Sequence, residues 1–210
     1  MQKIVIFDMD GTLIDSGNDI THSVNYVRQE RYALSPMSVQ AVVDAINAPS
    51  RNLAEIFYGT VLYEPEAKEL FESHYYDQCI KNVSAYNGII EVLETLRGAN
   101  ARMGVATNAP RMFARRMLSH LGLEGYFELI VGADDVEQPK PHPQMIRRHL
   151  DHCGYRPGTD RAWMIGDNAK DMEAACNAGI EAVFAAWGFA AIADAHPIAR
   201  EPSEILCLIG

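Results

Sequence analysis

The stretch Lys3-Ile4-Val5-Ile6-Phe7-Asp8-Met9-Asp10-Gly11-Thr12 decides the fold class. Residues 3–7 form a short apolar run rich in β-branched side chains, which is typical of a strand buried on both faces. Two carboxylates, Asp8 and Asp10, follow this strand directly. Like charges at a strand end repel each other, whereas ligands of open α/β sheets bind at the carboxyl ends of the strands. We therefore interpret Asp8 and Asp10 as functional residues.

Comparable apolar runs recur along the chain, and they predict further strands at 102–106, 127–131, 161–165 and 182–185. Between them, apolar residues recur at helical spacing, as in Ile90, Leu93 and Leu96. Strands that alternate with amphipathic helices favour a parallel sheet covered on both faces. The predicted fold class is α/β, with a doubly wound, Rossmann-like core.

The alternation is interrupted once, because residues 15–84 carry helical patterns and no strand pattern. Pro36 and Pro65 stand where first-turn prolines of helices are expected. The sequence thus predicts a helical cap domain over 15–84, inserted into a core made of 1–14 and 85–210. Residues 188–210 are the least regular part and indicate a turn with a last strand or helix.

Three more polar motifs follow predicted strands. Thr107-Asn108 directly follows the strand 102–106, Lys140 stands between Pro139 and Pro141, and Asp167 and Asp171 follow the strand 161–165. Each motif alone fits a turn, a helix cap or a loop. Together they place two acids, a hydroxyl, an amide, a lysine and a pair of hard-cation ligands at one sheet edge, which is what phosphoryl transfer requires.

These motifs resemble those of the haloacid dehalogenase-like superfamily, in order and spacing, over nearly the full chain. The most specific matches are Asp-x-Asp-Gly-Thr at 8–12 and Gly-Asp-x-x-x-Asp at 166–171. Within the superfamily the chain is most similar to phosphoglycolate phosphatase-type members, on the residues Asp15-Ser16-Gly17-Asn18-Asp19-Ile20, Tyr86-x-Gly88, Lys140-Pro141-x-Pro143, Ala178-Gly179 and Trp187-Gly188-Phe189. The helical insert corresponds to the cap of that family.

The resemblance implies a Mg²⁺-dependent phosphatase that acts on a small phosphorylated metabolite. Asp8 is then the nucleophile, which becomes an aspartyl-phosphate, and Asp10 is the general acid and base. Thr107 and Lys140 hold phosphoryl oxygens, with Asn108 beside them. The implied ligands of Mg²⁺ are Asp8, the main-chain carbonyl of Asp10, and Asp167, with Asp171 in support.

The cap is expected to set the substrate. Arg51 falls in the first turn of a predicted cap helix, where the helix dipole disfavours a cation, so we expect it to contact the leaving group. The substrate stays open, because Ala109 and Ala48-Pro49 depart from the phosphoglycolate phosphatase pattern.

Two alternatives are kept beside the phosphatase. A sugar phosphomutase on the same core differs mainly in its cap, where His22 and Arg51 could serve it. A catalytically silent binding protein would retain the fold for regulation, although every expected catalytic position here holds a competent residue.

Composition and charge argue against some classes of binding partner. The chain of 210 residues has a formal net charge of −10 and 48% apolar residues. Nucleic acids and anionic membranes are polyanions, so neither is an expected partner. The N-terminal apolar run is too short for a signal peptide or membrane span. The cysteines are scattered without zinc-site spacing and are expected to be reduced. We expect a cytoplasmic protein, either a monomer or a homodimer.

Overall fold

The computed structural model describes residues 1–48, 52–189 and 197–210. By its contacts the described chain divides into two compact units, which are treated separately below. Unit 1 comprises Met1–Asp15 and Ala85–Gly210, and unit 2 comprises Ser16–Ser84. None of the helices in the described ranges is long and apolar enough to cross a membrane.

Unit 1 is built on a six-stranded sheet in the order β5-β4-β1-β6-β7-β8, and all of its strand pairs are parallel. The predicted α/β class is therefore confirmed. The central strand β1 pairs with β4 on one side and with β6 on the other. The strands are β1 (Lys3–Phe7), β4 (Arg102–Ala106), β5 (Leu129–Val131), β6 (Arg161–Gly166), β7 (Glu181–Ala185) and β8 (Ile198–Ala199).

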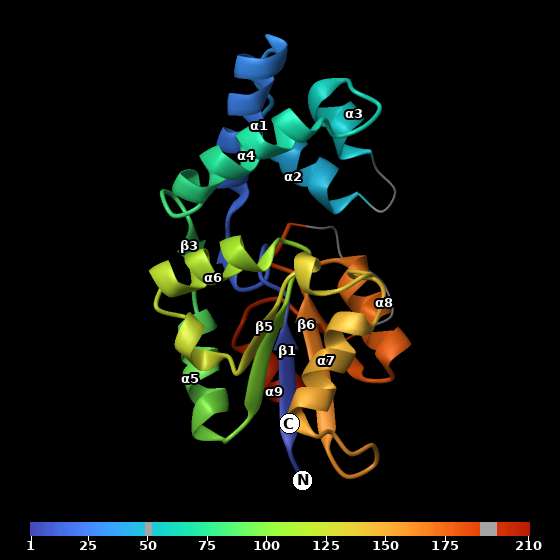
Figure 1. Ribbon diagram of the computed structural model, residues 1–210. Coiled ribbons are helices and arrows are strands. Elements are labelled where there is room, and N and C mark those ends of the chain that lie inside the picture. The colour runs from blue at the N-terminus through green and yellow to red at the C-terminus, as the bar shows by residue number, and fades with distance from the viewer. Residues whose placement is uncertain (49–51, 190–196) are drawn as a thin grey trace. The chain divides into compact units, whose positions relative to one another are not determined.

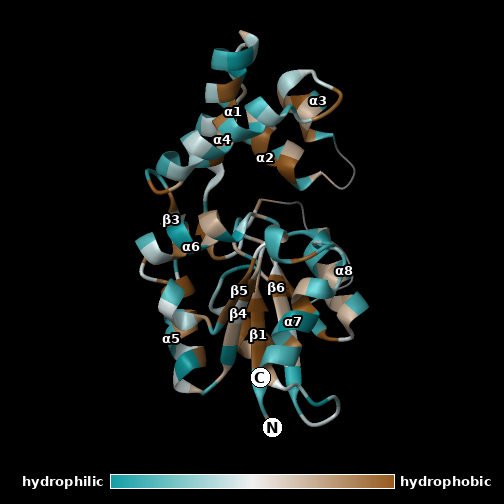
Figure 2. Cartoon of the chain, viewed as in Figure 1, coloured by the Kyte–Doolittle hydropathy of each residue, from teal (hydrophilic) through white to brown (hydrophobic). Residues whose placement is uncertain are grey.

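Both faces of this sheet are covered. Alternate residues of β1 point to opposite faces, and Ile4, Val5, Ile6 and Phe7 are all buried. Figure 2 shows β1 as hydrophobic over most of its length. On one face, Ile4 and Ile6 pack in a core cluster with residues of α7 (Gln144–Cys153) and α8 (Ala169–Ala178). The helices and 3₁₀ turns of unit 1 are α5 (Ile89–Gly98), α6 (Arg111–His120), η1 (Glu124–Tyr126), η2 (Ala133–Asp135), α7 (Gln144–Cys153), α8 (Ala169–Ala178) and α9 (Glu204–Ile209).

Unit 2 is helical and has its own core. Its helices are α1 (Gly17–Tyr32), α2 (Val39–Asn47), α3 (Leu53–Tyr58) and α4 (Pro65–Gln78), labelled in Figure 1. Val24 and Val27 of α1 pack with Val42 of α2, Phe57 of α3 and Ala67 of α4. Two short strands, β2 (Ile14–Asp15) and β3 (Ser84–Ala85), pair with each other where the chain passes from one unit to the other.

Three sequence predictions of local structure need correction. Pro65 opens α4 as predicted, but Pro36 lies outside a helix, because the side chain of Ser38 caps α2 by accepting the Ala41 N–H. The strand predicted at 127–131 is only β5, since Phe127 instead follows the 3₁₀ turn η1. The C-terminal region contains both a strand, β8, and a helix, α9, where one of the two was expected.

Candidate active site

Three of the predicted site residues of unit 1 lie at the carboxyl ends of three neighbouring strands. Asp8 follows β1, Thr107 follows β4 and Asp167 follows β6. The sheet pairing continues past the strand ends, because the Asp8 amide donates to the Ile165 carbonyl (2.8 Å) and the Thr107 amide to the Val131 carbonyl (3.0 Å). The Asp8 and Thr107 side chains thus project from a hydrogen-bonded main chain, which fixes their positions. This edge is where open α/β sheets bind ligands.

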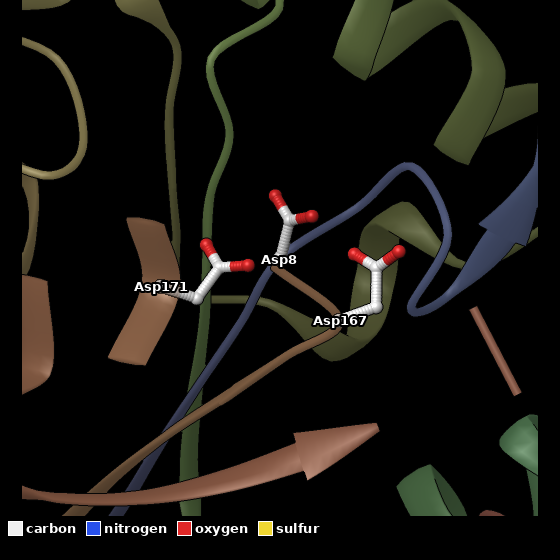
Figure 3. Close-up of side chains that lie close together, drawn as sticks. All are labelled: Asp8, Asp167 and Asp171. Carbon is white, nitrogen blue, oxygen red and sulfur yellow. The ribbon is translucent and has the colours of Figure 1, made fainter. Parts of the chain in front are cut away.

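Three buried carboxylates meet at this edge. Asp8, Asp167 and Asp171 each offer an oxygen, and these oxygens lie within 4.8 Å of one another. Figure 3 shows the three side chains grouped together. Asp171 is placed by the first turn of α8, where its carboxylate accepts the Asn168 N–H at 3.1 Å. In the described residues, this acidic cluster does not include the side chain of Asp10.

Lys140 inserts its ammonium group between two of these carboxylates. Its Nζ donates to Asp8 Oδ1 at 2.7 Å and to Asp171 Oδ1 at 2.5 Å, and the lysine side chain is only 3% exposed. The sequence alone left open whether Lys140 was a fixed cation or an exposed loop lysine. The structure identifies it as a buried, fixed cation.

Asn108 holds the main chain of Lys140 through both ends of its amide. Its Nδ2 donates to the Lys140 carbonyl at 2.9 Å, and its Oδ1 accepts the Lys140 N–H at 3.0 Å. The neighbouring Thr107 is buried, and its hydroxyl oxygen accepts the Ala109 N–H at 3.1 Å. Asn108 therefore joins the loop after β4 to the loop that carries Lys140.

The charges of the cluster perturb one another. Burial and, after it, the nearby Asp8 and Asp171 carboxylates together raise the pKa of Asp167 to about 8. Burial also raises the pKa of Asp171 to about 6, with Asp8 adding to the rise and Lys140 opposing it. For Lys140, burial lowers the pKa, but the attraction of Asp171 and Asp8 outweighs it, so the net shift is upward.

This donor set fits a hard divalent cation. Three carboxylates face a single lysine, so the buried cluster carries excess negative charge when ionised. Carboxylate oxygens are the ligands that Mg²⁺ prefers, and a bound cation would favour the ionised form of each acid. The residues present thus fit the predicted metal.

Asp10 lies in the turn that follows Asp8. The turn is closed by the amides of Thr12, Leu13 and Ile14, which all donate to the Met9 carbonyl. Gly11 has a φ of +83° in this turn, a conformation that favours glycine. The Asp10 residue is half-buried, and its backbone bridges to Ile14.

The cap residues are placed less completely. Arg51 lies outside the described residues, so its contact with a leaving group stays a prediction. His22, which was considered for a phosphomutase, lies on α1 and lines a hollow of about 650 Å³ in unit 2, together with Tyr26 and His74.

Sequence reasoning missed the hydrogen bonds that surround Asp167. The Phe189 main-chain N–H donates to Asp167 Oδ2 at 2.7 Å, and the Thr12 hydroxyl donates to Oδ1 at 3.4 Å. The indole N–H of Trp187 donates to the Thr12 carbonyl at 3.0 Å. Main-chain donors leave no side-chain signal in a sequence. The available signal was the Trp187-Gly188-Phe189 stretch, in which the glycine lies between the two residues that donate these main-chain and indole hydrogen bonds.

Comparison with known proteins gives a family from the sequence and a matching fold from the structure. A phosphoglycolate phosphatase of Aquifex aeolicus is 30% identical over 209 residues, which cover 99% of this chain and 96% of the relative. An N-acetylmuramic acid 6-phosphate phosphatase of Pseudomonas aeruginosa is 30% identical over 190 residues, covering 89% and 83%. The crystal structure of a predicted phosphoglycolate phosphatase from Haemophilus somnus superposes with a TM-score of 0.86 over 100% of this chain and 98% of that one, at 24% identity. The family model for haloacid dehalogenase-like hydrolases matches residues 5–185. The chain belongs to the haloacid dehalogenase-like hydrolases.

Proposed function

We propose that this enzyme, a phosphatase, hydrolyses a small phosphomonoester through an aspartyl-phosphate on Asp8, with Mg²⁺ as cofactor. The observation that carries the proposal is a buried group of three acids and a lysine. Asp8 and Asp167 follow β1 and β6, and they are joined by Asp171 of α8 and by Lys140. A cluster of like charges is unfavourable in a buried place without a counter-ion, which supports a role in binding a cation and a phosphoryl group.

The first step is attack by the Asp8 carboxylate on phosphorus. A bond forms between a carboxylate oxygen and phosphorus, the bond from phosphorus to the leaving oxygen breaks, and Asp10 donates a proton to that oxygen. In the second step a water molecule attacks the same phosphorus while Asp10 accepts its proton. Phosphate leaves, and the Asp8 carboxylate is restored.

Lys140 and Thr107 are proposed to hold the phosphoryl oxygens. An ammonium group has three N–H donors. In Lys140, two of them form hydrogen bonds to Asp8 and Asp171. The third donor has no partner among the described residues, and we propose that it binds a phosphoryl oxygen. A positive group that is fixed before the reaction stabilises the charge of the transition state without reorganising.

Asp8, the main-chain carbonyl of Asp10, and Asp167 are proposed to hold Mg²⁺, with Asp171 in support. When bound, the ion supplies positive charge that offsets the repulsion between the acidic cluster and the phosphate, and it polarises a phosphoryl oxygen.

We propose 2-phosphoglycolate as the first substrate to test, because several relatives at 30–32% sequence identity are named phosphoglycolate phosphatases. The Pseudomonas aeruginosa relative is named for a different substrate, a sugar acid phosphate, at the same 30% identity. Both compounds carry a phosphomonoester and a carboxylate, which is the chemistry that Arg51 could recognise.

The test is release of phosphate from a generic aryl phosphate and from a panel of phosphorylated metabolites, with Mg²⁺ and with excess chelator. We expect turnover with Mg²⁺, none with chelator, and a covalent phosphoenzyme that is trapped in the wild type but lost in Asp8→Asn. Full turnover in chelator would refute the cofactor, and an Asp8→Asn variant that keeps a substantial rate would refute the covalent mechanism. Transfer of phosphate within a sugar phosphate, without release, would instead identify a mutase.

A further inference from the structure

The segment Trp187-Gly188-Phe189, which follows β7, contacts the site from a part of the chain distant from the four motifs. Its two hydrogen bonds go to Asp167 and to Thr12, and the Thr12 hydroxyl contacts Asp167 in turn. Both carboxylate oxygens of Asp167 are thereby engaged. The 187–189 segment thus joins the turn after β1 to the residue that follows β6.

Gly188 makes this approach possible by its lack of a side chain. A Cβ at this position would lie 2.3 Å from the Asp167 Cβ, 2.3 Å from the Gly11 carbonyl oxygen and 2.5 Å from Asp167 Oδ2. All three distances are far shorter than a van der Waals contact. The φ angle of Gly188 lies outside the left-handed region, so glycine is needed here for space and not for its backbone conformation.

We propose that the 187–189 segment positions the Asp167 carboxylate for the metal ion. Gly188 lets the main chain approach, the Phe189 amide fixes Asp167 Oδ2, and the Trp187 indole anchors the segment to the turn after Asp8. The inference rests on the proposed function, in which Asp167 holds Mg²⁺. Groups that orient a metal ligand in this way act on metal affinity, because a misplaced ligand binds the ion less tightly.

The test compares Gly188→Ala with Gly125→Ala, whose added Cβ would meet no atom within 4 Å. The dissociation constant of Mg²⁺ is measured by titration calorimetry, and the melting temperature is measured in chelator. We expect Gly188→Ala to weaken Mg²⁺ binding by about 10–100-fold, while Gly125→Ala binds as the wild type does. A purely structural role for Gly188 would lower the melting temperature in chelator and leave the dissociation constant of the folded protein unchanged.

A second variant, Trp187→Phe, keeps an aromatic ring and removes the indole N–H. We expect it to weaken Mg²⁺ binding by about two- to tenfold, the range for loss of one neutral hydrogen bond. If Gly188→Ala does not fold, this variant decides the question. The inference is overturned if a folded Gly188→Ala variant binds Mg²⁺ as tightly as the wild type does. If Gly188→Ala does not fold, the same result in Trp187→Phe overturns it. Either result leaves the proposed function intact. A wild-type protein that binds no Mg²⁺ refutes the metal site itself, and the inference with it.

Discussion

Acid should destabilise this protein through one buried histidine, His149 of α7. Its ring is packed against β4, its residue is only 2% exposed, and its Nε2 lies 3.0 Å from the Val105 carbonyl oxygen. Because a carbonyl only accepts, Nε2 carries the proton of the neutral ring and donates it. Gly104 leaves the space for this ring, since a Cβ there would lie 2.3 Å from His149 Nδ1.

The sign and size of the effect follow from the pKa of His149. The pKa falls from 6.5 to about 4. Burial is the main cause, the hydrogen bond to Val105 opposes it, and the charges of His152 and Arg148 add to the fall. Between pH 6.5 and about pH 4, this histidine is protonated in the unfolded chain but neutral in the folded protein. The free energy of unfolding therefore falls as the pH falls through this range. At about 1.4 kcal/mol per pKa unit, the full contribution is about 3 kcal/mol, of which about 2 kcal/mol is lost between neutral pH and about pH 5.

The perturbation is His149→Gln, which keeps an N–H near the position of Nε2 but cannot titrate. Urea unfolding at pH values near 7 and 5 gives the free energy of unfolding of each protein. The wild type should lose about 2 kcal/mol more than the variant over this interval. His120→Gln, at the exposed end of α6, is the control and should keep the wild-type pH dependence. If wild type and His149→Gln lose equal free energy, the buried ring is not the origin of acid sensitivity.

Three further predictions concern the site. Asp10→Asn should lower kcat by about 10²–10⁴ while the substrate dissociation constant stays near the wild-type value, because only proton transfer is removed; single-turnover kinetics and direct binding separate the two. Lys140→Ala should lower kcat/KM by about 10²-fold or more, as for loss of a preorganised charge, whereas Lys68→Ala at a 66% exposed side chain of α4 should have no effect on aryl phosphate hydrolysis. Asn108→Ala should lower kcat/KM by about tenfold through release of Lys140, since it removes two neutral hydrogen bonds; an unchanged rate would show that Lys140 stays in place without them.

The sheet and the carboxylates of the site were predictable from the sequence because they depend on local patterns. A parallel strand buried on both faces must be continuously apolar, so the runs at 3–7 and 161–165 indicated β1 and β6 directly. Polar residues that follow such runs meet at one edge by the geometry of a parallel sheet. This reasoning located Asp8, Thr107 and Asp167 without any knowledge of distant contacts.

Contacts between distant segments could not be predicted in this way. The pairing of Asn108 with the main chain of Lys140 joins residues 32 apart in sequence, and the same Thr-Asn pair fits an ordinary turn. The Phe189 amide that holds Asp167 is a main-chain group and is present whatever the side chain. Pro36 was placed wrongly because a proline satisfies both a helix start and a loop, and here the cap at Ser38 decided between them.

The charge balance of the site explains why a lysine and a divalent cation are both needed in the proposed mechanism. Lys140 neutralises at most one of the three carboxylates that surround it, and its contacts are with Asp8 and Asp171. Asp167 then has no lysine partner in the described residues, and its pKa rises accordingly because of burial and its acidic neighbours. A phosphate dianion that approached this cluster would meet net negative charge in a poorly solvated place, where repulsion is strong. In the proposed mechanism, the two positive charges of a divalent cation held by Asp167 and Asp8 would cancel the negative charge that Lys140 leaves uncompensated. The repulsion of an approaching phosphate would fall accordingly.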